Sequence, residues 1–328
     1  MSRRRILISG GAGFIGFHLA SGFAHEENSE VVLLDNLSRG RVDDELARLL
    51  RLPNVRFVEG DVTDPSVWSS LPGPFDEIYH LAAIIGVRRV LSDPHEVTRV
   101  NTLGTLAALE WFSTQPDGRL LLASTSEVYA WTGQILDLPI PTPEDVPLAL
   151  TNLRDPRSAY AGSKMLGELA VTQYCRKFEK EFTIVRYHNV YGPRMGQEHV
   201  IPELYQRTQD GEAPLTVYSA HHRRAFCYVS DAVDGTVLAM RSSTGVGQTF
   251  NLGNEEEVEI ADLARRILRW AGRSVEIEPA SAENDPIERR CPDTSRARQL
   301  LGYAPAVCLD VGLDRTLTWY RDSSGRGP

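Results

Sequence analysis

The chain has 328 residues, which suffices for one large or two modest domains with an apolar core. Its hydrophobic fraction of 42% and its charged fraction of 24% are typical of an ordinary globular protein. The formal net charge of −9 argues against a nucleic-acid-binding surface, which needs clustered positive charge, and no apolar run approaches the ~20 residues that cross a membrane.

The first half of the chain alternates short apolar runs with segments of helical periodicity. Strands are predicted at residues 5–9, 31–34, 55–59, 77–81, 120–123 and 182–186. Helices are predicted at residues 14–23, 94–112 and 158–178. This alternation predicts an α/β fold, a doubly wound parallel sheet of the Rossmann type covered by helices on both faces.

The second half of the chain is less regular. Residues 131–156 are rich in Pro, Leu and Asp and are expected to form a long loop beside a functional site. Further helices are expected at 201–209, 231–240 and 260–271. We therefore expect a dinucleotide-binding domain over residues 1–190 and a smaller C-terminal substrate lobe over 191–328, interleaved with the first. The polar tail 321–328 is expected to be disordered.

A glycine-rich turn follows the first strand. In the run Gly10-Gly11-Ala12-Gly13-Phe14-Ile15-Gly16, the glycines allow the backbone to approach a diphosphate, and the helix that begins here offers free N–H groups to it. Its position between a strand and a helix is the one that dinucleotide binding requires. Gly10, Gly13, Phe14, Ile15 and Gly16 are therefore predicted to contact the cofactor.

Asp35 ends the second strand, where a carboxylate can accept both ribose hydroxyls of adenosine. It would repel a 2′-phosphate, so NAD is favoured over NADP, and the neighbouring Asn36 joins the predicted site. A simple turn residue is the alternative for Asp35, and Arg39 is a residue that could meet a 2′-phosphate. After the third strand, Asp61 and Val62 could contact the adenine, but a helix N-cap region is an equally good interpretation.

Tyr160 and Lys164 are spaced to share one face of the helix predicted at 158–178. A lysine ammonium beside a tyrosine favours the phenolate and should lower the tyrosine pKa, which is ~10 when unperturbed. Tyr160 could then accept a proton from a sugar hydroxyl as hydride leaves the carbon.

Together with the glycine-rich turn, Asp35 and the Ser/Thr cluster at residues 124–126, this pair resembles the extended short-chain dehydrogenases, the NAD-dependent epimerase/dehydratase family. The resemblance covers nearly the whole chain. It implies that Leu81, Ala82 and Ala83 after the fourth strand line the NAD site, as do Asn101, Tyr160 and Lys164. The segments 186–194 and 250–253 also look like this family, in which the asparagine at the position of Asn189 meets substrate phosphate.

The segment Thr125-Ser126-Glu127 resembles that of the UDP-glucuronate decarboxylases, or UDP-xylose synthases, rather than the Thr-Asp-Glu of the 4,6-dehydratases. Arg223-Arg224-Ala225-Phe226, Asn284-Asp285-Pro286 and Arg290-Cys291-Pro292-Asp293 are similar to further segments of those decarboxylases. The resemblance implies two sets of residues beyond the cofactor site. The catalytic set is Thr125, Ser126, Glu127, Tyr160, Lys164 and Arg224. The substrate-binding set is Asn189, Val200, Tyr218, Arg224 and Arg290. For Tyr218, packing in a core is an alternative.

The implied reaction is NAD-dependent decarboxylation of UDP-glucuronate. Oxidation at C4 would give a ketone β to the C5 carboxylate, so that CO₂ can leave, with Thr125 and Tyr160 stabilising the developing oxyanion. Glu127 and Arg224 are expected near the carboxylate. The products would be UDP-xylose, a UDP-4-keto-pentose, or both. The alternatives are a UDP-glucuronate 4-epimerase or another nucleotide-sugar epimerase or dehydratase, and a non-catalytic NAD-binding protein. Ala130 and the long segment that follows depart from the family pattern.

The apolar faces of the helices predicted at 94–112 and 158–178 could pair two copies of the chain, so a homodimer is expected, with burial inside the monomer as the alternative. The scattered residues Cys175, Cys227, Cys291 and Cys308 predict neither a zinc site nor a disulfide framework. We expect no bound metal, no nucleic-acid or membrane partner, no secretory leader and a cytoplasmic location.

Overall fold

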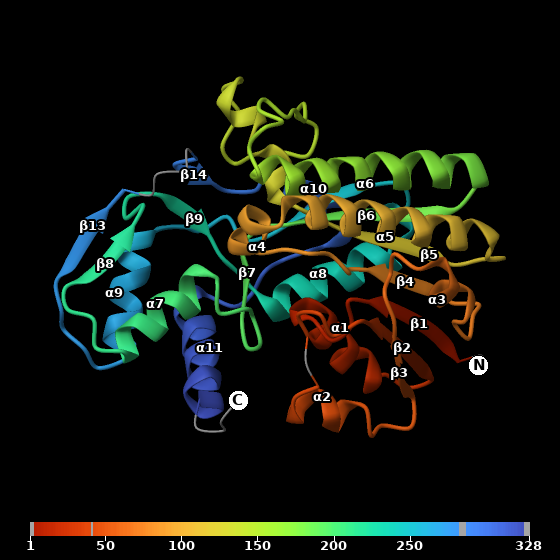
Figure 1. Ribbon diagram of the computed structural model, residues 1–328, viewed down its shortest axis with the longest axis horizontal. Helices are drawn as coiled ribbons and strands as arrows, with labels where there is room; N and C mark the ends of the chain where they lie inside the picture. The colour runs from red at the N-terminus through yellow and green to blue at the C-terminus, as the bar shows by residue number, and fades with distance from the viewer. Residues whose placement is uncertain (1–2, 41, 282–286, 325–328) are drawn as a thin grey trace.

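A computed structural model describes residues 3–40, 42–281 and 287–324 (Figure 1). Its centre is a seven-stranded sheet with strand order β11-β6-β5-β4-β1-β2-β3, in which every neighbouring pair is parallel. The strands are β1 (Arg4–Ser9), β2 (Ser29–Asp35), β3 (Val55–Glu59), β4 (Glu77–His80), β5 (Arg119–Thr125), β6 (Glu181–Tyr187) and β11 (Thr249–Leu252). The order β3-β2-β1-β4-β5-β6 is that of the doubly wound dinucleotide-binding fold, so the predicted fold class is confirmed.

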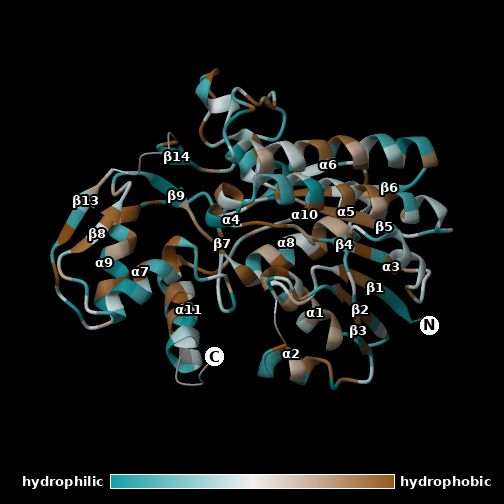
Figure 2. Cartoon of the chain, viewed as in Figure 1, coloured by the Kyte–Doolittle hydropathy of each residue, from teal (hydrophilic) through white to brown (hydrophobic). Residues whose placement is uncertain are grey.

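Both faces of this sheet are buried, and side chains of each strand point alternately to the two faces. Ile6 and Ile8 of β1 belong to one apolar core, and Leu7 between them belongs to another. The central strands are correspondingly brown in the hydropathy colouring of Figure 2. A run of apolar residues without polar alternation is what a sheet covered on both sides requires.

Two groups of helices cover the sheet. The core that contains Ile6 and Ile8 takes side chains from α1 (Phe14–Ala24), α2 (Asp44–Leu49), α8 (Val229–Arg241) and α10 (Ser295–Leu301). The core that contains Leu7 takes them from α3 (Pro65–Ser69), α5 (Pro94–Thr114) and α6 (Arg157–Phe178). The short α4 (Val87–Ser92) contacts α5 and α6. In the part of the chain that the structure describes, no helix combines the length and the apolar character that crossing a membrane would need.

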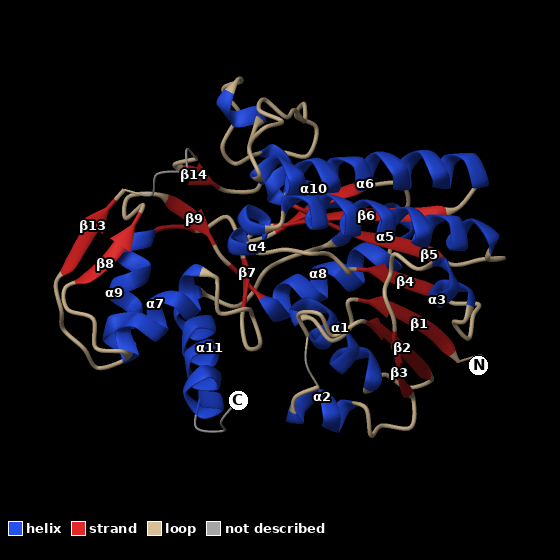
Figure 3. Cartoon of the chain, in the orientation of Figure 1, coloured by secondary structure: helices blue, strands red, loops and turns tan. Residues whose placement is uncertain are grey.

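The second lobe has its own apolar core, built from α7 (Val200–Gln209), α9 (Ile260–Trp270), α11 (Leu309–Ser324) and short strands. The strands are β7 (Val190–Tyr191), β8 (Leu215–Tyr218), β9 (Arg223–Ala225), β10 (Cys227–Tyr228), β12 (Glu257–Glu259), β13 (Ile277–Ala280) and β14 (Arg289–Arg290). They form three small sheets, β12-β9-β14, β13-β8 and β10-β7. Figure 3 shows this lobe beside the main sheet. The strand β11, from late in the chain, joins the main sheet next to β6.

Two features of the C-terminal half differ from the expectations. The tail is helical as far as Ser324, because Leu313, Leu317 and Tyr320 of α11 pack into the core of the second lobe. The expectation of disorder from Arg321 onward is therefore wrong for residues 321–324, and residues 325–328 lie outside the described part. The Asn284-Asp285-Pro286 segment also lies outside it.

Residues 130–156 between β5 and α6 form the long segment that projects at the top of Figure 1. One 3₁₀ turn, η1 (Ser126–Tyr129), lies just before this segment, and another, η2 (Thr132–Gln134), lies within it. A further 3₁₀ turn, η3 (Ser243–Gly245), follows α8. Thr142 forms a parallel bridge with Pro292. This contact holds the middle of the segment against the chain that follows β14.

Candidate active site

The glycine-rich turn joins β1 to α1, as the sequence predicts. Gly10 has φ +75°, a left-handed conformation, and a Cβ there would lie 2.8 Å from the backbone N of Ala82. A Cβ on Gly16 would collide with the carbonyl of Gly10. Gly13 is the N-cap of α1 and supplies no side-chain cap, so the N–H groups of the first helical turn, which begins at Phe14, are available to an anion.

Asp35 lies beside this turn at the end of β2. Its carboxylate accepts hydrogen bonds from the backbone N–H of Ala12 at 3.0 Å and of Leu37 at 2.9 Å. Burial raises its pKa, against the two hydrogen bonds, which lower it. A carboxylate fixed between the glycine-rich turn and the loop after β2 fits the ribose hydroxyls of a dinucleotide. The turn interpretation also holds in part, because the bond to Leu37 closes a turn.

Asp61 and Asn36 meet at the same edge, with Asn36 Nδ2 donating to Asp61 Oδ2 at 3.3 Å. The other oxygen of Asp61 accepts from the backbone N and Oγ1 of Thr63, both at 2.8 Å. These hydrogen bonds lower the pKa of Asp61, although desolvation, the largest single cause, raises it. Asp64, not Asp61, caps α3. An adenine contact by Asp61 and the buried Val62 stays a prediction.

The chain after β4 passes directly over the glycine-rich turn, which brings Leu81, Ala82 and Ala83 to the predicted cofactor site. Leu81 N donates to Ser9 O at 3.0 Å. Asn101 on α5 holds the continuation of this segment: its Oδ1 accepts from Ile84 N at 2.7 Å, and its Nδ2 donates to Ile84 O at 3.1 Å and to Ser163 Oγ at 3.2 Å. Its side-chain amide therefore fixes the wall of the site to α6.

Thr125 and Tyr160 come together at the carboxyl end of β5. The Tyr160 hydroxyl lies near enough to the Thr125 side chain for Thr125 to lower its pKa, and Thr125 Oγ1 accepts a hydrogen bond from Glu127 N at 3.2 Å. Tyr160 packs against the apolar cluster of Ile84, Val90 and Val97. That Thr125 and Tyr160 act on one sugar oxygen stays a prediction.

Lys164 lies one helical turn from Tyr160, and its Nζ donates to the carbonyl of Ala123 at 2.7 Å. Burial lowers the pKa of Lys164 to about 8, against the opposing charge of Glu168. Burial also raises the pKa of Tyr160 to about 12, and Lys164 is not among the groups that lower it. The net shift of the Tyr160 pKa is thus opposite in direction to the one expected from Lys164, because burial outweighs the charges around the hydroxyl.

We expect the turnover rate to fall as the pH rises through about 8, because Lys164 then loses the positive charge that favours the proton-accepting phenolate of Tyr160. The pKa of this buried amine is lowered from 10.5, so its charge is largely complete at pH 6.5 and mostly lost at pH 9.5. A pH profile of kcat measures this limb. In Lys164→Met the residual rate should show no such decline, and a limb that persists there would assign it to another group.

Glu127 forms an ion pair with Arg290, not with Arg224. Arg224 and Arg290 are opposite each other in the β9–β14 pairing. The Arg224 guanidinium instead donates to the carbonyls of Glu288 at 3.0 Å and Ile287 at 2.8 Å. The structure thus pairs Glu127 with Arg290, while the guanidinium of Arg224, which was expected near the sugar carboxylate, is bonded to backbone carbonyls. Ser126, the first residue of η1, is half-buried beside them.

The other substrate-binding candidates lie on the second lobe or at its border. Asn189 Nδ2 donates to Ala225 O at 2.9 Å. Val200 is the first residue of α7. Tyr218 is 54% exposed at the end of β8, with the Arg207 guanidinium 5.8 Å from its ring centroid. The core alternative for Tyr218 is therefore wrong, and its contact with a nucleobase stays a prediction.

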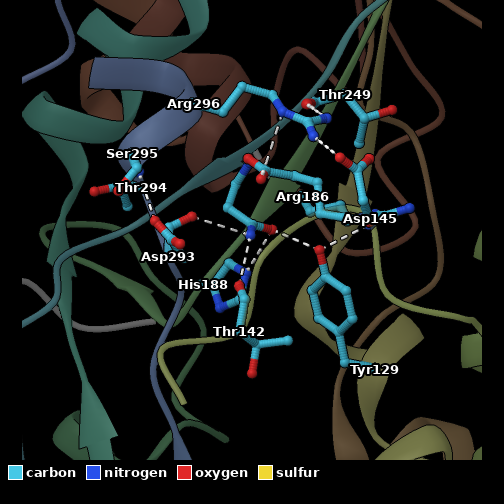
Figure 4. A network of polar contacts seen from close by, with 12 residues as sticks. Tyr129, Thr142, Asp145, Arg186, His188, Thr249, Asp293, Thr294, Ser295 and Arg296 are labelled. Carbon is cyan, nitrogen blue, oxygen red and sulfur yellow. Dashed lines mark hydrogen bonds and ion pairs between the residues drawn. The ribbon is translucent and has the colours of Figure 1, made fainter. Parts of the chain in front are cut away.

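A buried polar network beneath the site was not foreseen from the sequence. Arg186 on β6 forms an ion pair with Glu168 on α6 at 2.6 Å and donates to the Tyr129 hydroxyl at 2.7 Å. Figure 4 shows Arg186, Tyr129 and His188 in this network. The pKa of Arg186 is raised by Glu168 although burial opposes this. In the sequence, the only indication of this network is that Lys164 and Glu168 are spaced to share one face of a helix.

His188 lies in the same network with almost no exposed surface. Its Nε2 is 3.1 Å from Asn251 Oδ1, and Nδ1 has no hydrogen-bond partner among the described residues. Burial lowers the pKa of His188 to about 4, so the ring is neutral at physiological pH. The neutral imidazole adds no further positive charge to those of Arg186 and Arg290.

The fold and these groups define a dinucleotide-dependent enzyme of the short-chain dehydrogenase type, with a hydroxyl–tyrosine–lysine constellation beside a dinucleotide site. Residues 6–253 match the model of the NAD dependent epimerase/dehydratase family, and the chain belongs to this family.

Its relatives carry three related activities. The chain is 35% identical over 322 residues to UDP-glucuronic acid decarboxylase 1 of Xenopus tropicalis, covering 97% of this chain and 72% of the relative. The structure is similar to dTDP-glucose 4,6-dehydratase from Streptomyces venezuelae with NAD bound, with a TM-score of 0.86, 28% identity and 98% of each chain covered. It is also similar to UDP-glucose 4-epimerase from Thermotoga maritima, with a TM-score of 0.85, 27% identity and 98% and 99% coverage. The cofactor is NAD, for which the glycine-rich turn and Asp35 provide fitting groups.

Proposed function

We propose that this enzyme decarboxylates UDP-glucuronate through a 4-keto intermediate, giving UDP-xylose, a UDP-4-keto-pentose, or both. The observation that carries the proposal is the Glu127–Arg290 ion pair beside Thr125 and Tyr160, whose side chains lie close to each other. This arrangement sets a guanidinium, which suits a sugar carboxylate, next to the hydroxyls that suit C4. The similarity to decarboxylases of several organisms supports it.

In this proposal NAD, when bound, supplies the hydride acceptor for C4 and later returns the hydride. Tyr160 takes the C4 hydroxyl proton in its phenolate form, for which it must first lose the proton that its raised pKa retains, and Thr125 hydrogen-bonds the same oxygen. The positive charge of Lys164, one helical turn away, favours this form. Both hydroxyls then stabilise the negative charge that develops on this oxygen as CO₂ leaves. Arg290 orients the carboxylate, and Glu127 holds Arg290 until the substrate arrives. The role proposed for Arg224 is to position Arg290 from the neighbouring strand.

A dehydratase is disfavoured because Ser126 lacks the acidic group that protonates a leaving hydroxyl. A UDP-glucuronate 4-epimerase is the second candidate, because an epimerase structure aligns over nearly the whole chain. An epimerase would need only Thr125, Tyr160 and Lys164 and would leave the sugar carboxylate in place. The two activities therefore differ in whether carbon is lost.

We expect UDP-glucuronate labelled with ¹³C at the carboxylate to release labelled CO₂, with a UDP-pentose or UDP-4-keto-pentose as the product. Mass spectrometry measures both. Glu127→Gln should slow CO₂ release by about tenfold or more, because the neutral amide no longer holds the guanidinium of Arg290. Glu256→Gln, at an exposed loop position, serves as the matched control. A nucleotide-sugar product with the same mass as UDP-glucuronate would contradict decarboxylation and favour the 4-epimerase.

We also propose that two copies of the chain pair through α5 and α6. Both helices bury one face against the main sheet and leave large apolar side chains exposed. These are Leu103 on α5 and Leu166, Leu169 and Phe178 on α6. Association would remove this apolar surface from water.

A further inference from the structure

Asn251 on β11 is fully buried, and both polar atoms of its side chain are hydrogen-bonded. Its Nδ2 donates to the carbonyls of Thr142 at 3.0 Å and Asp293 at 3.3 Å. Its Oδ1 accepts from the Tyr129 hydroxyl at 2.8 Å and is 3.1 Å from His188 Nε2. Because carbonyl oxygens only accept, these partners fix which way the amide points. Figure 4 shows these four partners gathered around one position.

The bond from Tyr129 connects Asn251 to the turn that carries Glu127. This turn, η1, runs from Ser126 to Tyr129, so Glu127 is only two residues from the bonded tyrosine. At the other end of the turn, Glu127 N donates to Thr125 Oγ1 at 3.2 Å. The backbone that presents the Glu127 carboxylate is therefore held on both sides, and Asn251 holds the end that leads into the long segment 130–156.

The two carbonyl contacts connect Asn251 to the chain that follows Arg290. Arg290 ends β14, a strand of two residues paired with β9. Directly after it, Thr142 N donates to Cys291 O at 2.9 Å, and Asp293 N donates to Thr142 O at 2.9 Å. Asn251 Nδ2 donates to the carbonyls of both Thr142 and Asp293. The backbone beyond Arg290 is therefore bonded to the long segment and to Asn251 together.

The long segment is itself fastened to the main sheet at this point. The backbone N–H of Asn251 donates to Glu144 Oε1 at 2.8 Å, and Arg186 on β6 donates to the carbonyl of Glu144 at 2.9 Å. Thr142, two residues earlier, is thus held against β11 and β6, which are neighbours in the sheet. Through Thr142, the rigid sheet reaches the backbone that follows Arg290.

We propose that Asn251 is a positioning residue that fixes Glu127 and Arg290 relative to each other and so sets recognition of the sugar carboxylate. This role rests on the proposed function, in which Arg290 exchanges Glu127 for the carboxylate of the substrate. The guanidinium has to keep its direction during that exchange, which requires a backbone held from outside the ion pair. Asn251 is buried, so it acts through the two segments that it joins, and a fully paired buried amide makes that link rigid.

The substitution Asn251→Asp tests this role with nearly unchanged side-chain volume. A carboxylate at this position can still accept from Tyr129, but it cannot donate to the carbonyls of Thr142 and Asp293, so the chain after Arg290 should shift. UDP-glucuronate and UDP-glucose differ only in the carboxylate that the first carries. We expect the ratio of their affinities to fall by about tenfold, with UDP and NADH affinity unchanged.

Calorimetric titration of the full-length enzyme loaded with NADH measures these affinities. This form has no hydride acceptor, so the sugars bind without turnover. Tyr129→Phe is a second, milder variant, because it removes one hydroxyl and keeps the ring. Arg186, which also donates to that hydroxyl, keeps its ion pair with Glu168. In Tyr129→Phe the affinity ratio should fall by about threefold, since only the contact with the Glu127 turn is lost.

Asn54→Asp is the matched control. Asn54 directly precedes β3, at the amino end of the sheet and away from the site, and its Nδ2 donates to the carbonyl of Ala24 at 3.0 Å. The control therefore loses the same kind of bond to a backbone carbonyl. Its stability should fall as that of a hydrogen-bonded asparagine does, but its ratio of UDP-glucuronate to UDP-glucose affinity should equal that of the unmodified enzyme.

Three results would overturn the proposal. An affinity ratio in both Asn251→Asp and Tyr129→Phe within a factor of about two of the control would remove Asn251 from carboxylate recognition. An equal loss of affinity for UDP and NADH would show a general structural role. If the unmodified enzyme itself does not prefer UDP-glucuronate to UDP-glucose, the carboxylate site of the proposed function fails, and this role fails with it. The first two results leave that site intact.

Discussion

Tyr160→Phe is expected to reduce kcat by about 10²–10⁴-fold and to leave NAD binding nearly unchanged. The substitution removes one hydroxyl, which lies near the Thr125 side chain. The ring remains to pack against Ile84, Val90 and Val97, so the fold should be preserved. Steady-state turnover of UDP-glucuronate and calorimetric titration with NAD measure the two effects separately.

Tyr174→Phe is the matched control because Tyr174 lies on the same helix, where its ring packs near Phe178. Its kcat should equal that of the unmodified enzyme. Turnover in Tyr160→Phe within a factor of about three of that control would exclude Tyr160 as the proton acceptor, since loss of a general base costs far more. A parallel loss of NAD affinity would instead assign Tyr160 a binding role.

Arg186→Met is expected to destabilise the protein by about 3–5 kcal/mol, the largest stability effect among the changes considered. Arg186 and Glu168 have side chains only 6% and 9% exposed, so removing the guanidinium leaves the Glu168 carboxylate buried without its counter-charge. Arg186 also donates to the carbonyl of Glu144 at 2.9 Å, which ties the long segment 130–156 to β6. Urea denaturation followed by circular dichroism measures the loss.

Two comparisons test the cause. The double variant Glu168→Leu/Arg186→Met should lose less stability than the single variant, because it leaves no uncompensated charge. Arg265→Met removes one partner of the exposed pair with Asp262 on α9 and should change stability by no more than about 1 kcal/mol. An equal loss in Arg186→Met and Arg265→Met would contradict the importance assigned to the buried pair.

The elements of the first half were predictable because their signals are local. The apolar run around Ile6–Ile8 and the glycines from Gly10 to Gly16 each follow from neighbouring residues, and the structure contains the corresponding strand and turn. The Tyr160–Lys164 spacing also follows from helix geometry. What the local pattern could not show was the environment, since the pKa of Tyr160 rises with burial by residues of other elements.

The partner of Glu127 illustrates the opposite case. Residues 127, 224 and 290 are far apart in the chain. Residue type alone does not say whether Arg224 or Arg290 forms the ion pair with the carboxylate of Glu127. The pairing of β9 with β14 places both arginines side by side, and the carbonyls of Ile287 and Glu288 occupy one of them. Which arginine pairs with Glu127 depends on the backbone geometry of β9 and β14, which the spacing of residues in the sequence does not predict.

The sequence by itself determined the dinucleotide-binding fold, the cofactor and the glycine-rich turn, because these rest on periodicity and on contiguous residues. The tertiary structure alone decided the joining of β11 to the sheet, the Glu127–Arg290 pair and the buried Glu168–Arg186 pair. These are contacts between segments distant in sequence. Their formation depends on how packed elements meet, and burial then sets the charge state of the groups they bring together.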